Sequence, residues 1–333
     1  MSETALVTGS AGFIGFHTAE RLLQAGHKVI GLDAMTDYYE PELKEARHGL
    51  LAQSPGFQAV NARLEDEGVM ADLLAEHKPQ TVVHLAAQAG VRYSIDAPRS
   101  YVEANLIGTY ELLEAARAHP PEHLMLASTS SVYGANTEMP YAETHKADHQ
   151  MSFYAATKKA TEAMAHSYAH LYGIPTTMFR FFTVYGPWGR PDMALFKFVK
   201  AIRASEAIDV YNHGEMSRDF TFVEDLVEGI SRLRAAVPGD QKVSEIDSLS
   251  PVAPFRVVNI GNSAPTKLLD FIRAIEGALG QKAELNMMDM QPGDVPATWA
   301  DGSLLADLIG ELPHTPLELG VRRFVDWYRD YYG

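Results

Sequence analysis

A tyrosine and a lysine four residues apart, Tyr154 and Lys158, are the side chains of this sequence best suited to acid–base chemistry. That spacing places both on one face of a helix, one turn apart. A cation held beside a phenol favours the phenolate and pulls the phenol pKa down from about 10 towards neutrality. The pair alone is also typical of an amphipathic helix whose lysine extends to solvent. The choice between these two interpretations depends on the elements that surround the pair.

An apolar strand at 5–7 is followed by a turn with three glycines, Gly9, Gly12 and Gly15, and then by a helical pattern. A second strand follows and ends at Asp33, an order typical of a dinucleotide-binding unit. Glycine lets the backbone approach a pyrophosphate, and the start of the helix offers N–H groups and the positive end of its dipole. Asp33 can accept hydrogen bonds from an adenosine ribose diol and repels a 2′-phosphate, which favours NAD over NADP.

Later segments continue the alternation of strand and helix, with apolar strands at 82–87 and 124–127 and helical periodicity over 101–118. This order predicts an α/β fold with a parallel, doubly wound sheet of the Rossmann type, in which ligands bind at the carboxyl ends of the strands. The residues predicted to contact the cofactor are Gly9, Gly12, Phe13, Ile14, Gly15, Asp33, Leu85, Ala86 and Ala87, together with Tyr154 and Lys158.

Composition limits the remaining function classes. The chain has 333 residues, no cysteine and a formal net charge of −15, which excludes thiolate sites and argues against nucleic-acid binding. It has no apolar run of about 18 residues and no signal-peptide pattern, so we expect a cytoplasmic protein without a membrane span. The histidines are scattered, and no metal site is expected.

Two further segments carry candidate ligand groups. A hydroxyl cluster, 128–131, follows a buried strand; such clusters usually serve turns, but a hydroxyl here could also bond the substrate oxygen that Tyr154 deprotonates. The irregular loop 183–193 contains a tryptophan and Arg190, which suits either a ligand lid or a packed anchor. Arg218 precedes a helical pattern and could hold a phosphate through its two-pronged guanidinium or form a surface ion pair.

With these elements in order, the chain resembles the extended short-chain dehydrogenase/reductase family over nearly its whole length. Within that family it looks most like UDP-glucuronate 4-epimerases. The segments that carry this resemblance are AAQAGVRYS at 86–94, AATKKA at 155–160 and RFFTVYGPWGRPDMA at 180–194.

The resemblance implies a hydride shuttle. Tyr154, ionised with help from Lys158 and the nicotinamide cation, would take the proton of the sugar 4-hydroxyl, and Thr129 would share that hydroxyl. Tightly held NAD would take the C4 hydride and return it to the opposite face of a transient 4-keto sugar, so that UDP-glucuronate becomes UDP-galacturonate without net oxidation.

The resemblance also implies how the substrate is held. Related decarboxylases carry a glutamate where this chain has Ser131, which argues against loss of CO2 from the β-keto acid. Arg190 matches an arginine that the group places near the sugar carboxylate, and a threonine at 183 is a feature of the uronate enzymes. The residues expected to contact the substrate are Arg92, Ser130, Ser131, Thr183, Arg190, Met193, Arg218 and Asp294.

The domains implied are an NAD-binding domain, 1–180, with a returning strand near 255–261, and a smaller C-terminal α/β domain, 181–333, that mainly binds the UDP-sugar. Helices near 99–118 and 151–172 would form a homodimer. One departure from the family is Arg63, where an acid usually contacts the adenine. The alternatives are a UDP-glucuronate decarboxylase, an epimerase of neutral UDP-hexoses and, more distantly, an NAD-binding regulatory protein.

Overall fold

Seven parallel strands form the central sheet of the computed structural model, which describes residues 3–291 and 294–333. In sheet order they are β10 (Phe255–Ile260), β6 (Thr176–Phe181), β5 (His123–Thr129), β4 (Thr81–His84), β1 (Thr4–Thr8), β2 (Lys28–Asp33) and β3 (Phe57–Asn61). The chain builds outward from β1 to β3 and then returns to β4 on the other side of β1, so the order reverses between β1 and β4. The predicted doubly wound sheet is confirmed, and β10 is the predicted returning strand.

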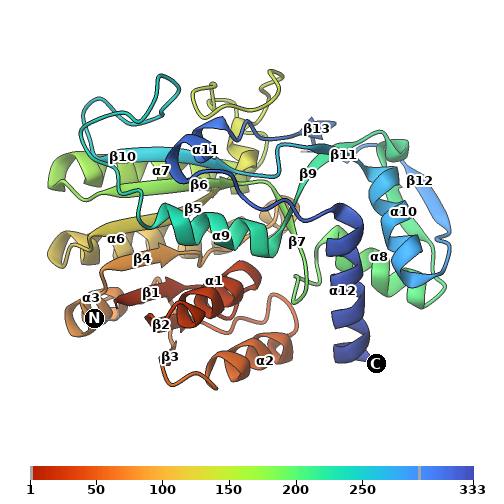
Figure 1. The fold of residues 1–333 in the computed structure, drawn as a ribbon, viewed down its shortest axis with the longest axis horizontal. Coiled ribbons are helices and arrows are strands. Elements are labelled where there is room, and N and C mark those ends of the chain that lie inside the picture. Colours follow the sequence, from red (N-terminus) through yellow and green to blue (C-terminus); the bar gives the residue numbers. More distant parts are fainter. Residues whose placement is uncertain (1–2, 292–293) are drawn as a thin grey trace.

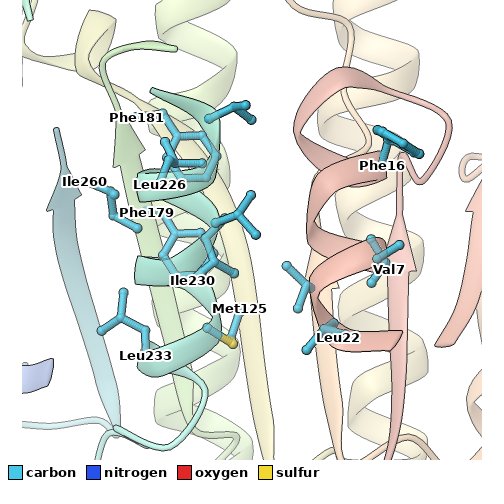
Figure 2. Close-up of a cluster of buried hydrophobic side chains, with 14 of the residues drawn as sticks. Val7, Phe16, Leu22, Met125, Phe179, Phe181, Leu226, Ile230, Leu233 and Ile260 are labelled. Carbon is cyan, nitrogen blue, oxygen red and sulfur yellow. The ribbon is translucent and has the colours of Figure 1, made fainter. Parts of the chain in front are cut away.

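Alternation along the strands sends apolar side chains to both faces of this sheet. Ala5 and Val7 of β1 belong to one core, and Leu6 between them belongs to the other. Figure 2 shows the first core, in which Val7 and Phe16 lie beside the strands and helices that enclose them. The helices of the first face are α1 (Phe13–Gln24), α2 (Pro41–Leu51), α9 (Val223–Leu233) and α11 (Ser303–Ile309), and those of the second are α3 (Val69–His77), α6 (Gly108–Ala118) and α7 (Phe153–Tyr172).

A smaller unit follows the end of β6 (Figure 1). This unit has its own aromatic core. Phe220 and Phe271 stack in this core at a centroid distance of 4.0 Å. Its strands are β7 (Thr183–Tyr185), β8 (Ile208–Tyr211), β9 (Ser217–Phe222), β11 (Pro265–Lys267), β12 (Leu285–Met288) and β13 (Ala297–Thr298), and its helices are α8 (Ala194–Arg203), α10 (Leu268–Leu279) and α12 (Leu317–Tyr332). Because β7 begins directly after β6, this unit lies beyond the carboxyl edge of the main sheet.

The structure differs from the sequence predictions at two places on that edge. The strand predicted to reach 87 ends at His84, and the following residues have no regular structure. The helix predicted over 101–118 is interrupted by a π-helical segment, Val102–Ile107, which lies between a short helix, α5 (Pro98–Tyr101), and α6. Within it the Asn105 side chain bonds both the amide and the carbonyl of Gln88, which gives the bulge a partner outside the helix.

Candidate active site

The turn between β1 and α1 has room only for glycine at two positions. Gly9 has a positive φ of 72°, and a Cβ there would lie 2.8 Å from a backbone nitrogen beyond β4. A Cβ on Gly15 would lie 1.9 Å from the Gly9 carbonyl oxygen. Helix α1 starts after Gly12 without a side-chain cap, and Phe13 and Ile14 provide its first amides. Such a turn fits an anionic group such as a pyrophosphate.

Asp33 ends β2 beside this turn, where two backbone donors fix its carboxylate. Oδ2 accepts the amide of Ala11 at 3.0 Å, and Oδ1 accepts the amide of Met35 at 2.9 Å. Arg63, which follows β3, donates from Nε to the Glu65 carboxylate at 2.8 Å. The arginine that replaces the family's usual acid is therefore paired with an acid two residues later, a partner that the sequence analysis did not identify.

The segment after β4 runs alongside the glycine turn. The amides of Leu85 and Ala86 bond the carbonyl and the hydroxyl of Thr8 at 3.2 and 3.1 Å. Ala86 and Ala87 are small and partly exposed. The cofactor contacts predicted in the glycine turn and those predicted at 85–87 therefore lie at one edge of the sheet, at the position where the strand order reverses.

Helix α7 presents Tyr154 in its first turn and Lys158 one turn later. Ser152 fixes the start of this helix, because its hydroxyl accepts a first-turn amide at 3.1 Å. Thr129 ends β5. Burial raises the pKa of the Tyr154 phenol, while a hydrogen bond with Thr129 and the charge of Arg190 oppose that rise.

Behind Tyr154, a buried ion pair supports Lys158. Burial lowers the Lys158 pKa to about 8, and the charge of Glu162 opposes this. Glu162 accepts hydrogen bonds from Nε and Nη2 of Arg180 at 2.9 and 2.8 Å. Burial favours a raised Glu162 pKa, but Arg180 outweighs burial and lowers it to about 2. Ser128 also donates to Glu162, at 2.6 Å, so this hydroxyl serves the ion pair.

The protein alone does not bring the Tyr154 pKa down, because burial outweighs the groups that oppose it. Burial dominates, and its net effect is a phenol pKa above 10. With a pKa lowered to about 8, Lys158 is still mostly protonated at neutral pH. A further positive charge beside the phenol is needed to shift its ionisation towards neutral pH.

Thr129 also organises the predicted hydroxyl cluster. Its Oγ1 accepts the amide of Ser131 at 3.2 Å and lies 3.3 Å from the Ser131 hydroxyl, to which it donates. This interaction caps a short 3-10 helix, Ser130–Tyr133. Ser130 and Ser131 are partly exposed directly beyond β5, which is the edge where the sequence analysis placed them.

The loop after β7 carries Arg190, whose guanidinium is already paired. Nε and Nη2 donate to the two carboxylate oxygens of Asp192 at 2.9 and 2.6 Å. The Tyr38 hydroxyl donates to the same carboxylate at 3.2 Å. Arg190, Thr183 and Met193 line one small cavity, so the structure brings these predicted substrate contacts together. The sequence analysis found the arginine but missed the acid and the phenol that orient it.

Arg92, Arg218 and Asp294 form a second polar group. Nη2 of Arg92 lies 3.4 Å from Oδ2 of Asp294, and its guanidinium lies 4.7 Å from the ring centre of Tyr211. Burial lowers the Arg218 pKa, and the charge of Asp294 opposes this. Two cations, an acid and an aromatic ring are suited to a diphosphate joined to a planar base.

Asn105 is a site residue that the sequence analysis missed. It is 1% exposed, and besides its two bonds to Gln88 it donates from Nδ2 to the Thr157 hydroxyl at 3.1 Å. It therefore joins the segment after β4 to α7, between Tyr154 and Lys158. A buried asparagine inside a helical apolar pattern was the available signal.

Few other features of the described residues suggest a binding site. A hollow of about 490 Å³ lies at the loop 236–243 and contains none of the predicted site residues. The described part of the chain holds no group of three or more acidic or histidine side chains that could bind a metal ion. None of its helices is both long and apolar enough to cross a membrane.

Comparisons with known proteins place the chain among nucleotide-sugar enzymes. A probable UDP-glucuronate 4-epimerase of Rhizobium meliloti is 55% identical over 331 residues, with 98% of this chain and 97% of that protein covered. UDP-glucuronate 4-epimerase 4 of Arabidopsis thaliana is 44% identical, with 99% of this chain and 76% of that protein covered.

A solved structure agrees over the whole chain. UDP-glucuronic acid 4-epimerase from Bacillus cereus, in complex with UDP-glucuronic acid and NAD, superimposes with a TM-score of 0.88 at 30% identity. The match covers 99% of this chain and 100% of that one. A family model matches residues 5–246. On sequence, fold and site geometry, the chain belongs to the NAD dependent epimerase/dehydratase family.

Proposed function

We propose that this protein inverts C4 of UDP-glucuronate to give UDP-galacturonate, with NAD as cofactor. The observation that carries the proposal is that Tyr154 and Lys158 of α7 and Thr129 at the end of β5 lie at the carboxyl edge of the sheet, where the loop that carries Arg190 is bonded to the glycine turn through Arg47. A proton-transfer group and a cation suited to a sugar carboxylate thus belong to one site. Relatives named UDP-glucuronate 4-epimerase support the same substrate.

The proposed proton transfer uses three side chains. As the phenolate, Tyr154 takes the proton of the sugar 4-hydroxyl, while Thr129 bonds the same oxygen and orients it. NAD held at the glycine turn and Asp33 would supply the hydride acceptor for C4, and the same hydride would reach the opposite face once the 4-keto sugar has turned over in the site. Tyr154 then returns the proton to the new hydroxyl. Lys158 stabilises the phenolate, and Glu162 favours the charged form of Lys158.

The 4-keto sugar has a ketone β to its carboxylate, so CO2 loss competes with epimerisation. That loss is slow when the bond to the carboxylate lies near the plane of the ketone, because its electrons then cannot flow into the carbonyl. We infer that Thr183, Arg190 and the hydroxyls of Ser130 and Ser131 hold the carboxylate in that orientation. The Asp192 pair supports this, since it fixes the direction of the Arg190 guanidinium.

Incubation with UDP-glucuronate, followed by NMR of the products, tests the proposal. We expect UDP-galacturonate at equilibrium with substrate and no net NADH. UDP-xylose or a 4-keto pentose would instead identify a decarboxylase. Turnover of UDP-glucose but not of UDP-glucuronate would identify a neutral hexose epimerase, and NAD binding with no turnover of either sugar would favour a regulatory protein.

The two-domain division and the homodimer are also proposals. The main sheet with β10 supports an NAD-binding domain of residues 1–180, and the aromatic core around β9 supports a sugar-binding domain of residues 181–333. The dimer is supported by exposed apolar side chains on and near α6 and α7. They are Ile95, Ile107, Tyr110, Leu171 and Tyr172, which are 41–65% exposed.

A further inference from the structure

Arg47 in α2 is a buried cation that joins the glycine turn to the loop after β7. Its side chain has no exposed surface. Nη1 donates to the Ala11 carbonyl and to the Tyr39 hydroxyl, both at 2.8 Å. Nη2 donates to the carbonyl of Trp188 at 2.6 Å and lies 3.4 Å from that of Gly189. One guanidinium therefore bonds the cofactor side and the substrate side of the site.

The loop depends on such contacts for its shape. Trp188 has a φ of 59°, a conformation that is strained for a bulky residue and persists only when its surroundings enforce it. Nε2 of His17 in α1 holds the preceding carbonyl, of Pro187, at 2.9 Å. Three consecutive carbonyls thus accept hydrogen bonds from α1 and α2. Arg190 comes next in the chain, so its position follows from this docking.

The hydrogen bonds of Arg47 all go to uncharged oxygens. In the described ranges it forms no direct ion pair, and its Nε has no hydrogen-bond partner. Lys44 lies nearby and is also cationic. A buried cation that bonds only neutral groups favours an anion at its side. The glycine turn, whose Ala11 carbonyl bonds Arg47, is where the cofactor's phosphates would bind.

We propose that Arg47 is a positioning residue that couples a pyrophosphate at the glycine turn to the order of the loop 186–193, and through that loop to Arg190. With the anion in place the guanidinium stays docked between turn and loop. Without it, a buried guanidinium that bonds only uncharged oxygens favours an arrangement closer to water, and the loop loosens. Only the consequence for a sugar carboxylate rests on the proposed function; the coupling itself needs only NAD.

Amide hydrogen exchange, measured with and without saturating NAD, tests the coupling. In the wild type, NAD should slow exchange about tenfold or more in both the turn, 9–15, and the loop, 186–193. In Arg47→Met the turn should still gain protection while the loop gains almost none, and NAD should bind about tenfold more weakly. Wild-type loop protection in Arg47→Met would overturn the proposal.

Two lysine variants distinguish the proposed coupling from a general loss of stability. Arg47→Lys keeps the charge but has a single nitrogen, which cannot reproduce the separate bonds of Nη1 to the turn and Nη2 to the loop, so NAD should protect the turn normally and the loop less. If Arg47→Met does not fold, equal protection in Arg47→Lys and wild type overturns the proposal. Arg256 is equally buried but bonds Asp247 bidentately, so Arg256→Lys should lose stability and keep NAD-dependent loop protection.

The outcome is separable from the proposed function. A wild type that protects its loop on NAD binding but does not convert UDP-glucuronate would remove the proposed reaction and leave the coupling in place. Where the reaction is observed, Arg47→Lys should raise KM for UDP-glucuronate about tenfold with a smaller change in kcat. The reason is that the group displaced with the loop, Arg190, acts on substrate binding.

Discussion

Arg190 and Asp192 form a bidentate ion pair, with Nε–Oδ1 and Nη2–Oδ2 distances of 2.9 and 2.6 Å. The cation proposed to meet a sugar carboxylate therefore already has a carboxylate partner two residues away. Nη1 of Arg190 has no acceptor in the described part of the chain and is the nitrogen left to a ligand. Selectivity for a uronate should depend on the pair as a unit.

Removing the guanidinium should separate uronate binding from nucleotide binding. In Arg190→Ala we expect affinity for UDP-glucuronate to fall about 10- to 100-fold, the range for a lost charge-assisted hydrogen bond, with little change for UDP-glucose. Calorimetry on a Tyr154→Phe background, where no turnover interferes, measures both. The matched control Asp192→Asn keeps the cation but weakens the pair that orients it, so it should lose less affinity for UDP-glucuronate than Arg190→Ala. Parallel losses for the two sugars would contradict the proposed role.

Loss of the phenol hydroxyl should stop proton transfer without emptying the cofactor site. We expect Tyr154→Phe to lower kcat about 10³-fold or more and to retain NAD, because the glycine turn and Asp33 are untouched. Thr129→Val should have a smaller effect, about 10- to 100-fold, since it orients the hydroxyl but does not take its proton. Product NMR and the NAD content of the denatured protein give the two readouts. An active Tyr154→Phe variant would exclude the mechanism.

The residue at 131 should control how often CO2 is lost. Ser131→Glu places a carboxylate beside the sugar carboxylate site, where like charges repel and favour another orientation of the breaking bond. We expect the fraction of UDP-pentose among the products to rise several-fold, as measured by NMR and by release of labelled CO2. The Ser131→Gln variant introduces a side chain of the same size as glutamate but without its charge. Its fraction of UDP-pentose should stay close to that of the wild type. An unchanged product ratio in Ser131→Glu would count against this account.

Local patterns were enough to predict the sheet and the cofactor turn. Gly9 and Gly15 stand where any Cβ would clash, so the sequence had to keep glycine there, and Asp33 has to end its strand. Tyr154 and Lys158 were found because helical spacing is fixed at 3.6 residues per turn. Features of this kind can be predicted because both partners lie within one element.

Contacts between distant segments could not be read from the sequence. Arg47 touches a carbonyl 141 residues away, and Tyr38 reaches Asp192 across 154 residues. The sign of the Tyr154 pKa shift was also unpredictable, because it depends on how deeply the folded protein buries the phenol. Burial, unlike spacing, is a property of the whole fold.

The exposed apolar face of α7 should be needed for self-association. Leu171 is 63% exposed, and Leu171→Glu would put a charge into any interface formed there. We expect light scattering after size exclusion to show a dimer for the wild type and a monomer for the variant. Leu319, which is 49% exposed on α12, provides the control, and Leu319→Glu should leave the dimer intact. A monomeric wild type would refute the proposed assembly.

Glu143 is a partly buried acid whose backbone carbonyl accepts a hydrogen bond from Nη1 of Arg180 at 3.3 Å. Burial raises its pKa to about 7, although its Oε1 accepts the amide of Asn259 at 2.7 Å. Its pKa in the unfolded chain is near the usual 4.5. The folded state therefore prefers the protonated acid. This contribution to stability is complete below about pH 4.5 and is lost as the pH rises through about 7.

Glu143→Gln should consequently stabilise the protein at pH 8 and have little effect at pH 5. The shift from 4.5 to about 7 corresponds to about 3 kcal/mol, which the wild type loses between those pH values and the neutral amide does not. Glutamine also keeps an oxygen for the Asn259 amide. Thermal unfolding of both proteins at pH 5 and pH 8 measures the difference in Tm. Because the acid is ionised above pH 7 in the wild type, a variant that is less stable than wild type at pH 8 would show that the carboxylate is held by favourable contacts and is not penalised by burial.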